Sequence, residues 1–119
     1  MQLSLKTAVI GILSLASTSS GFVVTVYSNP DCTGTAREIN VYDNTCRAPI
    51  SPGFAAFKVK TYGSSSQRAY FFRAGGCGDL ASAHQWWSDG GSDTFKADGR
   101  CLTEGPGTVW NAIASYFTI

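Results

Sequence analysis

Histidine, basic charge and long apolar runs are all scarce in this sequence. Nine Lys and Arg face eight Asp and Glu, so the formal net charge is only +1. Binding to nucleic acid or to an anionic membrane surface needs a basic excess, and we expect neither partner. The single histidine, His84, has no G-x-S-x-G sequence to accompany it, and the carboxylates are scattered among turn residues. We therefore expect no catalytic residues and no enzymatic activity.

The cysteines lack the spacing of a metal site. No C-x-x-C sequence occurs, and one histidine cannot complete a zinc site, so we expect no metal and no cofactor. An even number of cysteines in a small extracellular domain instead predicts disulfides. The four positions are Cys32, Cys46, Cys77 and Cys101.

The N-terminus has the features of a secretory signal peptide. Lys6 precedes an apolar run over residues 8–16, and small residues follow it over 17–21. A membrane-spanning helix needs about 20 apolar residues, so this run is too short to be an anchor. We assign residues 1–20 to the signal peptide and expect a secreted, extracellular protein. Without Lys6, the remaining domain of residues 21–119 has no net charge.

One short pattern occurs twice in that domain: an aromatic residue followed five positions later by a cysteine. Tyr27 precedes Cys32, and Phe72 precedes Cys77. Each copy follows a β-type run and comes before another cysteine, so the domain consists of two similar halves, about 22–62 and 69–119. We expect one disulfide within each half, Cys32–Cys46 and Cys77–Cys101, each contributing about 3 kcal/mol of stability.

The rest of the chain alternates between β-type runs and turns. Ile39 and Val41 share one face of a predicted strand, and Phe57 and Val59 share one face of another. Short strands separated by Gly, Pro, Asn and Asp turns are typical of an all-β sandwich or barrel. We predict strands over 22–27, 37–42, 54–62, 69–72, part of 95–102 and 109–119.

The repeated pattern resembles the Greek-key motif of the βγ-crystallin superfamily, which has an aromatic, four residues, a second aromatic, one residue and a glycine. In the first half Tyr27 and Gly34 match, with Cys32 at the second aromatic position. In the second half Phe72 matches and Cys77 again replaces the second aromatic, but the glycine falls one residue early, at Gly78, and Asp79 stands at the glycine position. The resemblance implies a disulfide-bonded β-sandwich of two Greek-key motifs. In particular, the sequence resembles the cysteine-bearing microbial members, several of which are secreted antifungal or killer-toxin-like proteins or protease inhibitors. It also resembles small secreted proteins of fungi in its general features.

Many microbial members of that superfamily bind calcium through a polar stretch near the end of each motif. In the second half only Asn111 and Ser115 match that stretch, and Ala112 replaces an acidic residue. The matching residues of the first half, 52–56, offer no side-chain oxygen of the kind that Ca²⁺ needs. We expect both calcium sites to be lost, which leaves a decayed calcium-binding protein as a third, plainer interpretation.

The most suggestive surface feature is the pair Trp86 and Trp87, beside a polar loop that contains Asp89 and Asp93. Successive residues of a strand point to opposite faces, so we expect one indole in the core and the other exposed. An exposed indole can stack on a sugar ring. We therefore predict a ligand-binding site at Trp86, Trp87, Asp89 and Asp93, in a monomeric, secreted effector or antimicrobial-type protein that recognises cell-wall polysaccharide. The alternative partner is an extracellular protein, with the loop over 88–93 inhibiting a hydrolase.

Overall fold

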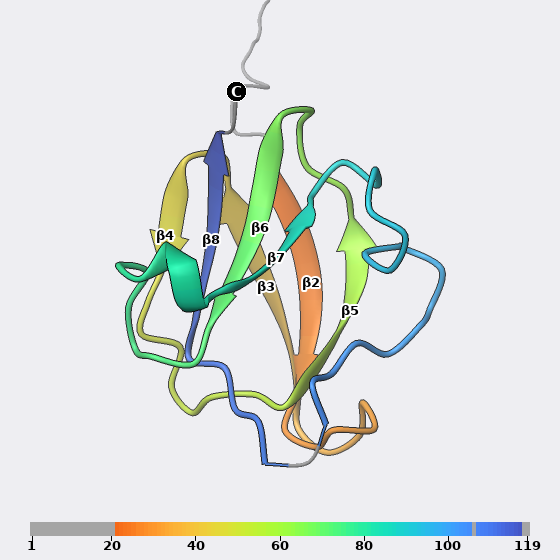
Figure 1. Ribbon diagram of the computed structural model, residues 1–119. Coiled ribbons are helices and arrows are strands. Elements are labelled where there is room, and N and C mark those ends of the chain that lie inside the picture. Colours follow the sequence, from red (N-terminus) through yellow and green to blue (C-terminus); the bar gives the residue numbers. More distant parts are fainter. Residues whose placement is uncertain (1–20, 106, 118–119) are drawn as a thin grey trace, which may run out of the picture.

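The computed structural model describes residues 21–105 and 107–117, and the predicted signal peptide lies outside them. In this part of the chain two antiparallel sheets pack face to face, with a single 3-10 turn and no α-helix (Figure 1). The described residues contain no helix of the length and apolarity required to cross a membrane. The elements are β2 (Gly21–Tyr27), β3 (Ala36–Tyr42), β4 (Thr45–Arg47), β5 (Ala56–Thr61), β6 (Gln67–Phe72), η2 (Leu80–Ser82), β7 (His84–Trp87) and β8 (Ala112–Phe117).

The two halves of the chain exchange segments between the sheets. One sheet has the order β3-β2-β5 and the other β4-β8-β6-β7. β4 belongs to the first half of the sequence but pairs with β8 in the second-half sheet. In the opposite direction, Leu102 from the second half pairs with Phe57 in β5. Each sheet is therefore completed by a segment from the other half of the sequence.

The period-2 pattern locates the main strands correctly. Ile39 and Val41 on β3 are buried, as are Phe57 and Val59 on β5, and the residues between them are more exposed. The prediction of a strand within 95–102 is wrong beyond the single bridge at Leu102, because residues 95–101 are bends and irregular backbone that pair with no strand. β4 was not predicted at all, since its three residues are all exposed and carry no apolar alternation.

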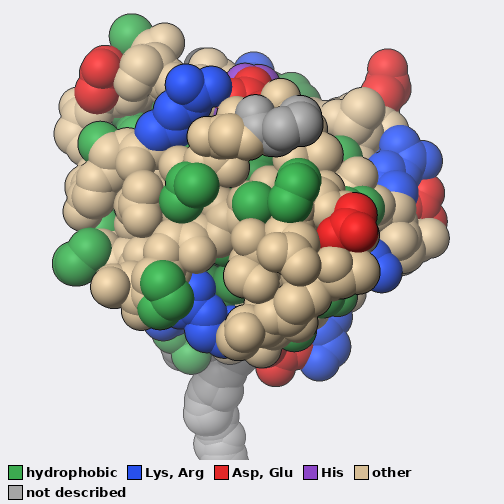
Figure 2. Space-filling model, turned by 90° about the horizontal axis from the view of Figure 1, so that it is seen from below, with side chains coloured by type: hydrophobic (Ala, Val, Ile, Leu, Met, Phe, Trp, Pro, Cys, Tyr) green, Lys and Arg blue, Asp and Glu red, His purple; other side chains and the backbone are tan. Residues whose placement is uncertain are grey.

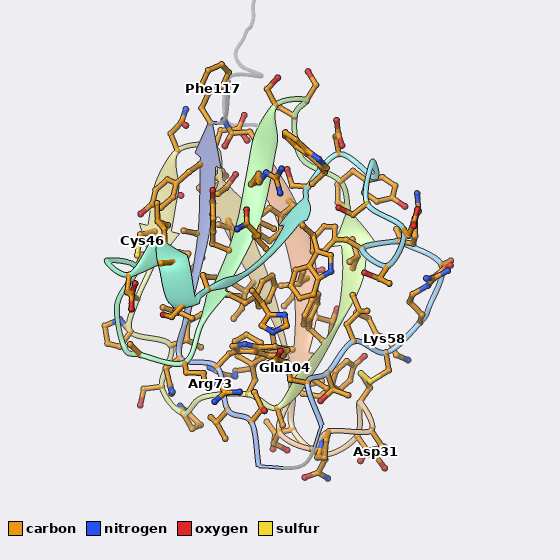
Figure 3. The ribbon with its side chains drawn as sticks, viewed as in Figure 1. Asp31, Cys46, Lys58, Arg73, Glu104 and Phe117 are labelled. Carbon is orange, nitrogen blue, oxygen red and sulfur yellow. A yellow bond between two sulfur atoms is a disulfide. The ribbon has the colours of Figure 1, made fainter. Side chains whose placement is uncertain are left out.

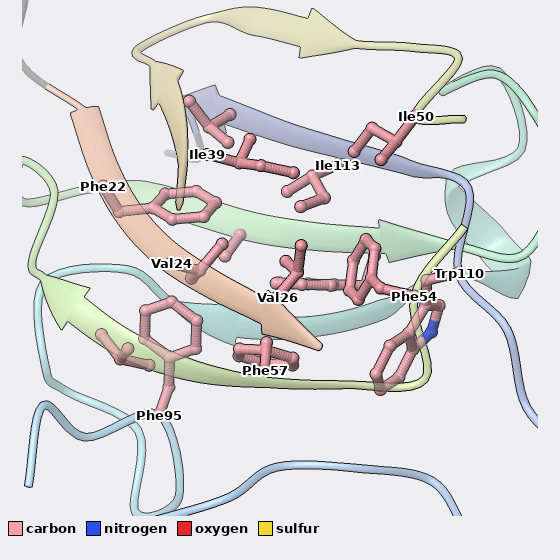
Figure 4. Packing of buried hydrophobic residues seen from close by; sticks show 14 residues of the cluster. Phe22, Val24, Val26, Ile39, Ile50, Phe54, Phe57, Phe95, Trp110 and Ile113 are labelled. Atoms are coloured by element: carbon pink, nitrogen blue, oxygen red, sulfur yellow. The ribbon is translucent and has the colours of Figure 1, made fainter. Parts of the chain in front are cut away.

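Aromatic side chains fill the space between the sheets (Figure 4). Phe57 of one sheet stacks on Phe71 of the other, with ring centroids 4.2 Å apart. Trp110 is 1% exposed and packs edge-on against both rings. Full burial of a large apolar side chain contributes about 1.5–3 kcal/mol, so each ring of this cluster stabilises the packing of the two sheets.

The predicted disulfide pairing is wrong. Cys32 is bonded to Cys101 and Cys46 to Cys77, so both disulfides join the two halves of the sequence. The reason is the exchange of segments. Cys46 lies on β4, within the second-half sheet. Cys101 directly precedes Leu102, which pairs with β5 in the first-half sheet. Two cysteines of the same half consequently belong to different sheets.

Candidate functional site

The tryptophan pair divides between the two faces of β7, as predicted. Trp86 points into the core, where it stacks on Phe95 with ring centroids 5.9 Å apart, and its Nε1 donates a 2.8 Å hydrogen bond to Thr94 Oγ1. Trp87 points to the outer face of the sheet and is half-buried. Of the two indoles, Trp87 is therefore the one placed to meet a ligand.

Trp87 belongs to a row of side chains that crosses three neighbouring strands. Arg68 on β6 is the register partner of Trp87 on β7 and also of Tyr116 on β8. The guanidinium carbon of Arg68 lies 4.0 Å from the centroid of the Trp87 ring, a cation–π contact that fixes the indole. Two strand spacings separate the outer residues by about 10 Å. We call these three half-buried residues the outer aromatic row.

A shallow hollow of about 380 Å³ adjoins the outer aromatic row. Trp87 lines it together with the predicted Asp89 and with Ser65, Ser66 and Gly91. The hollow thus combines one aromatic surface with a carboxylate and two hydroxyl groups. These are the groups that contact the apolar face and the hydroxyls of a sugar.

Hydrogen bonds within the loop after β7 hold the residues around the hollow in place. Trp87 N donates to Ser92 Oγ at 2.7 Å, and Gly91 N donates to Asp89 Oδ1 at 2.9 Å. The fourth predicted residue, Asp93, does not line the hollow; its exposed backbone carbonyl accepts a hydrogen bond from Arg100. The structure therefore brings Trp87 and Asp89 together and separates them from Trp86 and Asp93.

A second concave site, which sequence reasoning missed, lies at the opposite end of β7. It is a cavity of about 320 Å³, and Glu104 is its central charged residue. The carboxylate of Glu104 bonds to Arg73 Nη2 through one oxygen, at 3.1 Å, and to His84 Nε2 through the other. Figure 3 shows Arg73 and Glu104 next to each other low in the molecule, and Figure 2 shows the histidine against an acidic side chain. We call this the Glu104 cavity; its lining is Phe71, Phe72, Arg73, Ala74, Asp79, Ser82, His84, Glu104 and Trp110.

Local structure explains the position of Glu104. The segment that carries it is attached to β5 by the bridge at Leu102, and Thr103 Oγ1 donates a 3.0 Å hydrogen bond to the carbonyl of Ala55. Gly105 then adopts a φ of +106°, a left-handed conformation that glycine accepts without strain. The chain turns immediately after Glu104, leaving its side chain 18% exposed inside the cavity.

The remaining polar residues of the predicted calcium stretch are engaged within the protein. Asn111 Nδ2 donates to the carbonyl of Arg73 at 2.7 Å, and the buried Ser115 donates to Gln67 Oε1 at 2.7 Å. Among residues 21–105 and 107–117, His, Cys, Asp and Glu side chains form no group of three that could hold a metal ion. Asn111 and Ser115 act here as structural hydrogen-bond donors.

No family model, curated protein or solved structure matches the chain. The two concave sites at the ends of β7 are its candidate functional sites.

Proposed function

We propose that the protein is a non-enzymatic binding module that acts outside the cell and attaches to a polysaccharide through the outer aromatic row and the hollow beside it. The observation that carries this proposal is Trp87, whose indole is fixed by Arg68 and lines a hollow with Asp89. A fixed aromatic surface loses little conformational entropy when it binds. Cell-wall polysaccharide is the proposed target, and an effector or antimicrobial role would follow from that attachment.

The arrangement of the outer aromatic row suits an extended ligand. The row places Tyr116 and Trp87 about 10 Å apart across the sheet, on either side of Arg68. Arg68 also donates to Gln85 Oε1 at 3.2 Å, which restrains the guanidinium. A chain of several sugar rings spans such a row, whereas a single small molecule contacts one aromatic residue at a time.

We also propose that the two sheets are a pair of Greek-key motifs of the βγ-crystallin type. The exchange of β4 and of Leu102 between the sheets supports this arrangement. Gly34 supports it as well, because its φ of +86° is the conformation expected of the motif glycine. Gly78 has no positive φ, so the second motif departs from the pattern at the turn where the sequence does. An experimental structure tests this proposal, and it fails if β4 pairs within the first-half sheet.

Two disulfides and the predicted signal peptide support an extracellular location. Expression of the full chain in a eukaryotic host tests it. We expect the protein in the culture medium with a new N-terminus near residue 21, determined by N-terminal sequencing. Retention of an unprocessed chain inside the cells would contradict the proposal.

Co-sedimentation with insoluble chitin and β-glucan tests the polysaccharide proposal. We expect the wild-type protein to sediment with at least one of them and Trp87→Ala to bind about 30-fold more weakly. Loss of a central aromatic contact costs about 2 kcal/mol or more. Tyr42→Ala is the matched control, because Tyr42 is 44% exposed on the other sheet. Absence of wild-type binding to both materials refutes the polysaccharide target.

The same samples test the alternative of hydrolase inhibition. The loop after β7 is tied by its own hydrogen bonds, which suits an inhibitor, but glycines occupy its centre at Gly90 and Gly91. A glycine offers no side chain to enter a protease pocket. We therefore expect no inhibition of secreted proteases, and stoichiometric inhibition that Trp87→Ala leaves intact would favour the alternative over polysaccharide binding.

A further inference from the structure

We propose that the Glu104 cavity is a second binding site, separate from the outer aromatic row, and that it accepts a small hydroxylated carboxylate such as a hexuronic acid. The volume of about 320 Å³ is at the lower end of the range for small-molecule sites and suits one sugar ring. None of its lining residues lines the hollow beside Trp87.

The carboxylate preference follows from the bonds that are already made. Both oxygens of Glu104 are engaged, one by Arg73 and one by His84, so this acid is neutralised within the protein. Arg73 uses only Nη2 for that contact and is 69% exposed. Among the described residues its Nε and Nη1 have no acceptor, and guanidinium donors suit a carboxylate. Arg73 is therefore the anchor for the acidic group of the ligand.

Two other lining residues, Asp79 and Ser82, suit hydroxyl groups. Asp79 Oδ2 accepts a 2.9 Å hydrogen bond from Ser82 Oγ, while its Oδ1 has no partner among the described residues. A carboxylate oxygen is an acceptor only, so Asp79 favours a ligand hydroxyl and repels a second carboxylate. The ligand is oriented with its acidic group toward Arg73 and its hydroxyls toward Asp79. The buried rings of Phe71 and Trp110 form the apolar floor.

His84 supplies a further polar group to the cavity. Its Nε2 bonds to Glu104, and among the described residues its Nδ1 has no hydrogen-bond partner. That nitrogen is free to bond to a hydroxyl group of the ligand.

Both disulfides brace the walls of the cavity. Cys77 lies in the segment between Arg73 and Asp79, and Cys101 lies three residues before Glu104. Arg73 and Asp79 belong to the connection between β6 and β7, whereas Glu104 lies on the segment attached to β5, and a disulfide holds each of these segments to the fold. Such a braced site is preorganised, so binding loses little loop entropy.

Titration with D-galacturonate, followed by amide chemical shifts of the oxidised protein, tests the proposal. D-galactose is the matched probe, because it differs only in having a hydroxymethyl group in place of the carboxylate. We expect galacturonate to shift amides around Arg73, Asp79 and Glu104 and to bind at least tenfold more tightly than galactose. Equal binding of the two sugars, or shifts confined to the surroundings of Trp87, would overturn the proposal.

Variants separate this site from the outer aromatic row. We expect Arg73→Gln to weaken galacturonate binding at least tenfold, with Arg47→Gln as the control that removes the same charge from β4, outside the cavity. Trp87→Ala should leave galacturonate binding unchanged, so failure of the polysaccharide proposal would not affect this result. Equal weakening by both arginine variants would reduce the effect to net charge and refute the site.

Discussion

The disulfide pairing can be tested by removing the cysteines in matched pairs. In the chain-entropy model, the stability that a disulfide contributes grows with the length of the loop that it closes. Cys32–Cys101 spans 69 residues, which corresponds to about 4.4 kcal/mol. Cys46–Cys77 spans 31 residues, which corresponds to about 3.7 kcal/mol. Together they approach the whole stability of a domain of this size, about 5–15 kcal/mol.

Three double alanine variants distinguish the observed pairing from the one that the repeat suggests. Replacing Cys32 and Cys101 removes one disulfide and should cost about 4 kcal/mol, a fall in Tm of about 15–30 °C. Replacing Cys46 and Cys77 should cost slightly less. Replacing Cys32 and Cys46 breaks both disulfides, leaves two free thiols and should cost about 8 kcal/mol, enough to prevent folding at room temperature.

Urea unfolding followed by tryptophan fluorescence measures these differences, and tryptic peptides of the oxidised protein check the bonds directly. Arginines and lysines separate all four cysteines, so peptide 38–47 should be linked to peptide 74–96, and the N-terminal peptide ending at Arg37 to peptide 101–119. A Cys32/Cys46 variant as stable as the Cys32/Cys101 variant would refute the pairing. So would a link between the N-terminal peptide and peptide 38–47.

Three further predictions concern single side chains. Gln67→Leu should cost about 2 kcal/mol in urea unfolding, because Gln67 is 3% exposed and the hydroxyl of buried Ser115 would lose its acceptor. Gly34→Ala should cost about 2 kcal/mol by the same measurement, because the φ of Gly34 is +86° and the new Cβ would collide with the side-chain oxygen of Ser28. An unchanged midpoint of urea unfolding would exclude this backbone conformation at Gly34. Asp98→Asn should destabilise the protein at about pH 7 but not at about pH 2, because the hydrogen bond from Arg100 lowers the folded-state pKa of Asp98. The stability that the Asp98 carboxylate contributes is present above its unfolded-state pKa and is lost as the pH falls through its folded-state pKa. A stability difference between wild type and variant that does not vary with pH would contradict this.

The fold class was predictable because apolar alternation is a local signal. Val24 and Val26 on β2, like Ile39 and Val41 on β3, occur at every second position and all face the core. β4 has no such signal, since its residues are held by pairing with β8 and by the disulfide at Cys46 rather than by burial. The incorrect disulfide pairing follows from this omission. Without β4 in the second-half sheet, the expected partners are the two cysteines within one half.

The two concave sites differ in how far the sequence reveals them. Trp87 and Asp89 are two residues apart, so a local pattern is enough to identify their site. Arg73 and Glu104 are 31 residues apart and meet only because Leu102 pairs with β5. Nothing local in the sequence pairs His84 with Glu104, which is one of eight scattered acidic residues. The one available signal was the position of Cys77 and Cys101 beside charged residues, and it has meaning only once both cysteines are placed.

The register of β7 determines which residue faces each site. In His84–Trp87 the first and third residues point inward and the second and fourth outward, so a shift of one residue would turn His84 away from Glu104 and bury Trp87. A strand of four residues has few ladder hydrogen bonds with which to resist such a shift. Its anchor is Ser88, fully buried directly after the strand, whose backbone N–H and Oγ both donate to the carbonyl of Gln67, at 3.0 and 2.9 Å. These bonds fix one end of the strand to β6, and the contact between His84 Nε2 and the Glu104 carboxylate holds the other end. Because the two sites share this strand, a change at Ser88 that releases the register should impair both of them together.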